Sequence, residues 1–161
     1  MLLRELKLYI PAFVVLLAPQ IGYAKDIIFI EGLSQRTAEK PIKMSIEEFE
    51  ALAPASQIKT TTPWHRQSTF SGISGKDLVK HLGIKGTTIN ALAINDYQVT
   101  IPVSDLTELG VLFATRLNGK RLKLRNKGPV FVIYPFDQNP SLKTEVYYGR
   151  SIWQVKQLTI Q

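Results

Sequence analysis

Short segments in which apolar and β-branched residues cluster, and often alternate with polar ones, recur along the chain and predict strands. These segments are residues 26–30, 57–62, 89–94, 98–101, 111–117, 121–125, 130–134 and 153–160. The run 130–134 is apolar throughout, which is typical of a central strand. In residues 121–125 the alternation predicts one basic strand face, with Leu122 and Leu124 directed toward the core.

Two helices are predicted from their capping residues. Ser45 and Glu48 have the spacing of a capping box, and an apolar stripe continues from them to Pro54, over two to three turns. Ser74 is placed to cap a second helix that ends at Gly83. Both predicted helices are short, and the predicted strands outnumber them.

Turns connect the predicted strands. Asn118-Gly119, between two strand segments, is the strongest hairpin signal of the chain. Residues 95–97 form a second turn between strands, and residues 102–109 hold a helical turn. The segment after Trp64 is polar and is expected to be a loop up to Phe70. We therefore expect an α+β fold, a single compact domain with a mixed β-sheet and short helices.

The first 24 residues differ from the rest of the chain. Arg4 and Lys7 precede an apolar stretch, and Gly22 and Ala24 are small residues at the positions that a signal peptidase reads. We expect residues 1–24 to be a signal peptide and residues 25–161 to be the domain, located in the periplasm or secreted. The apolar stretch is short for a membrane span, so no stable membrane insertion is expected after cleavage. An uncleaved anchor is the alternative.

Composition narrows the chemistry. The chain of 161 residues contains no cysteine, which excludes disulfides, thiol nucleophiles and thiolate metal ligands. Its formal net charge is +7, and +6 without the leader, which favours anionic partners: a small molecule or an acidic protein face. Nucleic acid is not expected, because the sequence has no basic helix and no interleaved aromatic platform.

Two blocks of the sequence carry a family resemblance. The first contains residues 59–64, residues 70–73 and residues 77–78; the second contains residues 117–119, 127–129, 133–137 and 150–153. Together they resemble the molybdopterin-binding domain of sulfite-oxidase-type oxidoreductases, over most of the chain from about Lys59 onward. The resemblance implies that fold, a molybdopterin cofactor and redox activity.

The sequence departs from that family where the cofactor would be held. The family's metal-binding cysteine lies four residues before an aromatic, and Thr60 stands at that distance before Trp64. Phe131 and Ile152 stand where the resemblance implies two cations. We therefore predict no bound cofactor or metal, no catalytic residue, and a role as a ligand- or partner-binding accessory or sensory module. The alternative is a molybdopterin-dependent oxidoreductase with non-cysteine coordination, so enzyme activity is left open.

Two groups of candidate site residues follow. The position where the resemblance implies the cofactor, together with its surroundings, defines a candidate ligand pocket. Its residues are Thr60, Trp64, His65, Asp96, Tyr97, Arg116 and Arg150. Five cations within eight residues define a candidate contact for an anion or an acidic partner: Lys120, Arg121, Lys123, Arg125 and Lys127. A solvated basic strand face is the alternative for the second group, and a turn with Asx hydrogen bonds is the alternative for residues 95–97.

Overall fold

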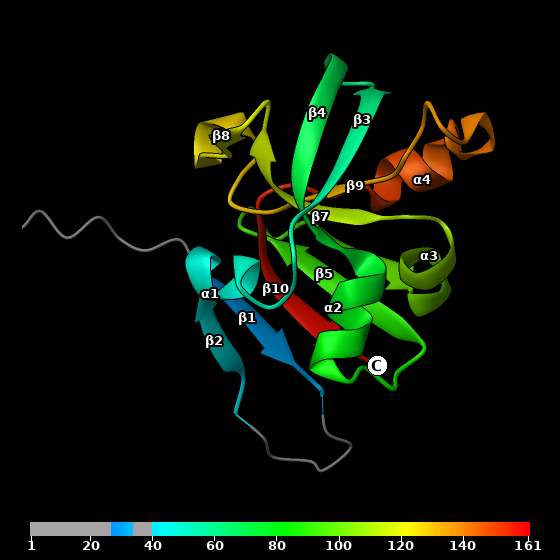
Figure 1. Cartoon of the computed structure of the whole chain (residues 1–161). Coiled ribbons are helices and arrows are strands. Elements are labelled where there is room, and N and C mark those ends of the chain that lie inside the picture. The colour runs from blue at the N-terminus through cyan, green and yellow to red at the C-terminus, as the bar shows by residue number, and fades with distance from the viewer. Residues whose placement is uncertain (1–26, 34–39) are drawn as a thin grey trace, which may run out of the picture.

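The computed structural model describes residues 27–33 and 40–161 as two sheets with short helices between and around them (Figure 1). The proposed signal peptide lies outside the described residues. The first sheet has the spatial order β2-β1-β10-β5-β6, and β1 runs parallel to β10 while its other pairs are antiparallel. Its strands are β1 (Ile27–Glu31), β2 (Ile42–Ser45), β5 (Thr88–Ala93), β6 (Gln98–Pro102) and β10 (Val155–Ile160).

The second sheet is antiparallel and has the order β3-β4-β7-β8, with β9 paired to β7 beside β8. Its strands are β3 (Ser56–Thr62), β4 (His65–Ser74), β7 (Leu112–Leu117), β8 (Lys120–Arg121) and β9 (Phe131–Ile133). The fold class is thus α+β as predicted. One sheet is mixed, and the second sheet is an addition that the sequence did not indicate.

The helices are short. They are α1 (Ile46–Glu50), α2 (Gly75–Leu82), α3 (Val103–Glu108) and α4 (Glu145–Arg150), with 3-10 turns η1 (Leu124–Asn126) and η2 (Pro140–Leu142). No helix in the described part of the chain is long and apolar enough to cross a membrane.

Local signals were confirmed where a cap or a turn decides the conformation. Ser45 and Glu48 form the predicted capping box, although α1 ends at Glu50 rather than near Pro54. Ser74 caps α2, and Gly83 ends it in the left-handed conformation. Asn118 and Gly119 both have positive φ, +49° and +77°, as a tight hairpin turn requires.

Three predictions for segments of the second sheet were wrong at least in part. The segment after Trp64 is strand β4 rather than a loop, because its polar residues pair with β3 along most of their length. The strand expected over 121–125 stops at Arg121, and Leu124 lies in η1 with 49% of its surface exposed. The apolar run 130–134 is buried as predicted, but β9 pairs with only one strand, β7.

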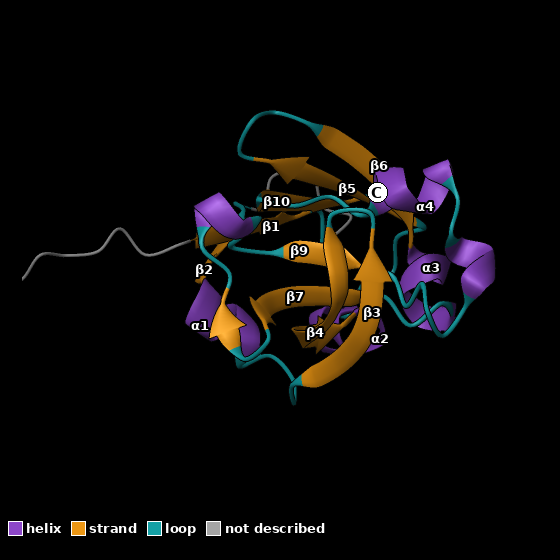
Figure 2. Cartoon of the chain, turned by 90° about the horizontal axis from the view of Figure 1, so that it is seen from above, coloured by secondary structure: helices purple, strands orange, loops and turns teal. Residues whose placement is uncertain are grey.

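The second sheet separates two hydrophobic cores. Strand β9 lies between β7 and the first sheet (Figure 2) and directs Val132 into a first core, while Phe131 and Ile133 enter a second core on the opposite face. The second core consists of Ile58, Phe70, Leu112, Ala114, Leu122, Phe131 and Ile133. Trp64 and Trp153 pack against its edge.

Candidate functional site

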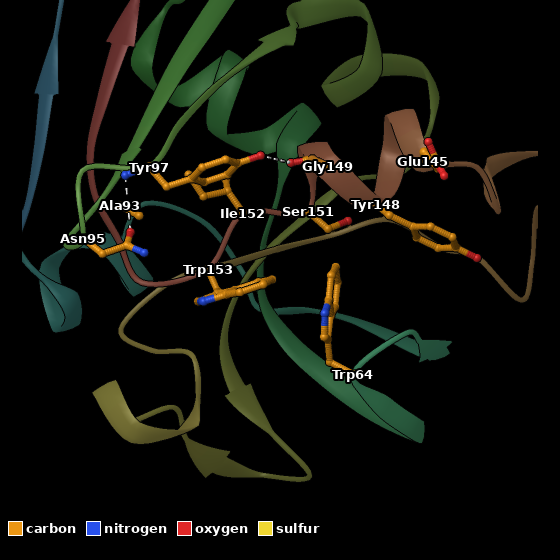
Figure 3. Close-up of a pocket in the computed structure, with 10 residues that line it drawn as sticks. All are labelled: Trp64, Ala93, Asn95, Tyr97, Glu145, Tyr148, Gly149, Ser151, Ile152 and Trp153. Carbon is orange, nitrogen blue, oxygen red and sulfur yellow. Dashed lines mark hydrogen bonds between the residues drawn. The ribbon is translucent and has the colours of Figure 1, made fainter.

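A cavity of about 460 Å³ opens where the edge of the second core meets α4 and the turn between β5 and β6. Four aromatic side chains dominate its lining (Figure 3): Trp64, Tyr97, Tyr148 and Trp153. The remaining lining residues are Ala93, Asn95, Glu145, Gly149, Ser151 and Ile152. We call this cavity the aromatic pocket. Its size and its mainly apolar lining are those of a small-molecule site.

Two tryptophans form one wall of the aromatic pocket, and they are the only tryptophans of the chain. Trp64 comes from the turn between β3 and β4, and Trp153 comes from the segment between α4 and β10. Their rings meet edge to face, with centroids 4.9 Å apart and planes at 69°. Each ring centroid also lies 6.0 Å from that of Phe131, so the second core supports both indoles from below.

The opposite wall is built by Tyr97 and α4. The Tyr97 hydroxyl donates a hydrogen bond of 3.3 Å to the carbonyl of Gly149, which connects the β5–β6 turn to the end of α4 (Figure 3). The Asn95 side chain accepts from the Tyr97 backbone N–H, so the predicted Asx turn is present. Tyr148 packs on Phe136 with a centroid distance of 5.0 Å. A hydrogen bond from a side chain to the main chain therefore holds the two parts of this wall together.

Helix α4 is anchored behind the aromatic pocket by a partly buried ion pair. Arg150 Nη1 donates to Asp105 Oδ2 at 2.8 Å, and the Tyr134 hydroxyl donates to the same oxygen at 2.8 Å. Burial and the neighbouring Asp105 carboxylate raise the pKa of Tyr134 above its usual range, so this hydroxyl remains a donor. Arg150 therefore positions the helix that carries Tyr148.

Thr60 lies away from the aromatic pocket lining. Its side chain is completely buried at the end of β3. Its Oγ1 accepts a hydrogen bond of 3.0 Å from the backbone N–H of Asp137 and donates one of 3.2 Å to the Thr61 carbonyl. The position that the resemblance assigns to a metal-binding cysteine is thus held by a hydroxyl that joins β3 to the loop after β9.

The other members of the predicted pocket are divided among different surroundings. Trp64 and Tyr97 line the aromatic pocket. Asp96, next to Tyr97, is exposed and pairs with Lys156 at 2.8 Å. Arg116 pairs with Glu50 at 3.1 Å beside a second, smaller cavity of about 230 Å³.

His65 is half-buried at the start of β4. Its ring packs edge to face on Phe70 at 5.7 Å, and its Nδ1 lies 3.3 Å from Thr62 Oγ1. Burial and the nearby Lys127 ammonium lower the pKa of His65, which favours the neutral imidazole. His65 is therefore close to the two-tryptophan wall without lining the aromatic pocket.

The predicted basic group of the hairpin is also divided. Arg121 forms ion pairs with Glu47 and Glu50 of α1, so it connects the second sheet to that helix. Lys120, Lys123 and Arg125 are exposed. Lys127 is half-buried, and its ammonium lies against the rings of Trp64 and Trp153.

Sequence reasoning missed most of the pocket's second wall. Tyr148, Gly149 and Glu145 belong to α4, a helix without a side-chain N-cap that the sequence did not indicate. Trp153 was predicted as the first residue of a strand and forms half of the tryptophan wall. A tyrosine pair beside a glycine in residues 147–149 was the one available signal.

Comparison with known proteins places this geometry in a fold class. No family model matches the chain, and no curated protein matches its sequence. Among solved structures, the chain is similar to the sulfane dehydrogenase SoxCD from Paracoccus pantotrophus, with a TM-score of 0.57 and 17% sequence identity. The match covers 83% of this chain and 37% of that chain. The domain therefore has a sulfite-oxidase-like fold, as the sequence blocks implied, and spans well under half of that relative's chain.

Proposed function

We propose that this protein is a binding module that takes up a flat heterocyclic small molecule in the aromatic pocket, without molybdenum chemistry. The observation that carries the proposal is the pairing of a two-tryptophan wall with a cysteine-free sequence. The fold is similar to that of the sulfane dehydrogenase SoxCD, and the chain has an aromatic cavity of small-molecule size. The soft sulfur ligand that such a metal centre uses is absent from the chain.

The lining of the aromatic pocket favours a planar ligand. Indole and phenol rings stack on flat heterocycles, and each such contact contributes about 1–3 kcal/mol in nucleic-acid complexes. Asn95 and Ser151 add polar groups that can orient a ring edge. A pterin is the first candidate, because the resembling domain binds the pterin-containing molybdopterin and a free bicyclic pterin suits a cavity of about 460 Å³.

The residues that would have to hold an anionic metal cofactor are engaged elsewhere. Thr60 is buried and hydrogen-bonded to Asp137, and it offers oxygen rather than sulfur. Arg116 and Arg150 are paired with Glu50 and Asp105. The one charged side chain among the lining residues is a carboxylate, Glu145. These contacts favour the binding module over an oxidoreductase with non-cysteine coordination.

We further propose that the module acts outside the cytoplasm and presents its ligand state to a protein partner. The signal-like residues 1–24 support export, and the net charge of +6 on the remaining residues favours an acidic partner. The exposed cations Lys120, Lys123 and Arg125 give an acidic partner a contact surface.

The binding proposal is tested by calorimetric titration of the metal-free protein with pterin. Because Trp64 and Trp153 are the only tryptophans, the two indole N–H signals in an NMR spectrum report on the aromatic pocket alone. We expect saturable binding with shifts of both signals, and about tenfold or greater weakening in Trp153→Phe, which shortens the stacking surface. Phe29→Leu, an aromatic replacement on β1 at a residue that does not line the aromatic pocket, is the matched control. Unchanged indole signals at saturating pterin would contradict a pterin ligand.

A further inference from the structure

The ammonium group of Lys127 lies against the tryptophan wall, so the protein itself supplies a cation there. Its Nζ lies 3.6 Å from the ring centroid of Trp153, 5.3 Å from that of Trp64 and 6.0 Å from that of Phe131. These distances fall within the range of cation–π interactions. Lys127 itself is not among the residues that line the aromatic pocket.

The main chain holds Lys127 in this place. The Lys127 carbonyl accepts a hydrogen bond of 3.1 Å from the backbone N–H of Gln154, the residue after Trp153. Gln154 Nε2 donates a second one of 2.9 Å to the carbonyl of Leu124, three residues before Lys127. Both segments are therefore joined in the register that puts the lysine beside the indole.

Lys127 has no ion-pair partner among the described residues. Within residues 27–33 and 40–161, no carboxylate lies within salt-bridge distance of its ammonium. Half-burial lowers its pKa. The faces of the two indoles thus supply the electrostatic stabilisation that a carboxylate usually gives.

The aromatic pocket would otherwise resemble a site for cations. Two tryptophans and two tyrosines with a carboxylate at the side are the residues that recognise quaternary ammonium groups in aromatic cages. A ligand cation on Trp153 would lie within about 6 Å of its ring centroid. With the ammonium 3.6 Å from that centroid, the two charges would be no more than about 10 Å apart.

We propose that Lys127 is a specificity-determining residue, an internal cation that makes the aromatic pocket select neutral or anionic heterocycles and reject cationic ones. The proposal rests on the proposed function only in that a ligand enters this pocket. At an effective dielectric constant near 20, two like charges at such a distance repel enough to weaken binding by about tenfold. The site is partly buried, so salt screens this repulsion only in part.

The test compares two bicyclic probes that differ in charge: neutral quinoline and cationic 1-methylquinolinium. Dissociation constants are measured by calorimetry, and the two indole N–H signals locate binding. In the wild type we expect quinoline to bind at least about tenfold more tightly than the cation. In Lys127→Met the affinity for 1-methylquinolinium should rise about tenfold. The preference for quinoline over the cation should then disappear or reverse.

Two matched variants separate this effect from general charge. Lys123→Met removes an exposed cation from the same segment and should leave the preference unchanged. Lys127→Arg keeps the positive charge and should therefore keep the preference for quinoline over the cation. Methionine preserves the length of the lysine stem, and the positive φ of +68° at this position strains both residues equally.

The outcomes are distinct from those of the function test. A folded Lys127→Met protein that still rejects the cation would overturn the inference, as would a wild type that prefers the cation. If Lys127→Met does not fold, the wild type is measured in low and high salt, and a cation affinity that does not rise with salt overturns it. Failure of pterin to bind would contradict the proposed function alone. Tighter binding of the cationic probe to Lys127→Met would still establish the role of Lys127.

Discussion

Thr60 and Asp137 are joined by a hydrogen bond of 3.0 Å from the Asp137 backbone N–H to the Thr60 hydroxyl oxygen, across 77 positions of the sequence. The reverse contact is also present: the Asp137 carboxylate accepts from the backbone N–H of Thr61 at 2.7 Å and from its hydroxyl at 2.9 Å. This reciprocal pair fastens the end of β3 to the loop after β9. At the position where the resemblance implies a metal ligand, the chain therefore has a residue whose hydrogen bond stabilises the fold.

Replacing Thr60 with valine should destabilise the protein. Valine has nearly the same shape but leaves the N–H of the half-buried Asp137 without the acceptor that Thr60 provides, which costs about 1–2 kcal/mol. Serine keeps the hydroxyl and loses one methyl group, at about 0.8 kcal/mol. Urea unfolding of both variants checks the order. A Thr60→Val protein as stable as the wild type would show that the hydroxyl is not needed there.

Asp137 should make stability depend on pH in the acid range. Its hydrogen bonds with Thr61, Lys143 and Gln67 lower its pKa to about 2, below the ordinary value of 3.8. Because the folded-state pKa is depressed, the stabilising contribution is complete above about pH 4 and is lost as the pH falls toward 2. In urea unfolding across this range, Asp137→Asn should lose less stability on acidification than the wild type. Parallel pH profiles would contradict the assignment.

Asp105 should be the most sensitive charged position behind the aromatic pocket. Its side chain is 8% exposed and accepts from both Arg150 and Tyr134. Removing it leaves a partly buried guanidinium and a buried hydroxyl unpaired. We expect Asp105→Ala to cost about 2–3 kcal/mol, less than a fully buried pair because Arg150 is 25% exposed. Glu108→Ala, an exposed carboxylate on the same helix, should change the unfolding free energy by less than about 0.5 kcal/mol.

The exposed cations after the β7–β8 hairpin give a fourth prediction. If Lys123 and Arg125 contact an anion, sulfate should raise the melting temperature of the wild type more than that of a Lys123→Ala, Arg125→Ala double variant. The same double variant in chloride of equal ionic strength is the control for screening. Equal responses to sulfate would leave these residues as a solvated surface.

Features decided by neighbouring residues could be read from the sequence. The capping box at Ser45, the stop at Gly83 and the hairpin at Asn118 each depend on contacts within a few positions. Strand β4 was missed because its first half is polar: its pairing with β3, rather than an apolar pattern, stabilises it. Leu124 was misplaced because a 3-10 turn interrupts the alternation after Arg121.

The site was predictable only in part. Trp64 and Tyr97 were named, and both line the aromatic pocket. The role of Trp153 depends on a contact with Trp64, 89 positions earlier, and no local pattern encodes that distance. Lys127 was counted with the basic hairpin, since sequence spacing does not show that its ammonium lies against two indoles. Long-range register, set by the pairing of the strands, decides these contacts.

The central claim, a binding module without molybdenum chemistry, is tested most directly by one purification. The protein is produced in a molybdenum-replete host, and molybdenum is measured together with oxidised-pterin fluorescence after release from the protein. We predict far less than one molybdenum per chain, with pterin retained or readily bound when added. One molybdenum per chain, bound together with molybdopterin, would contradict the account.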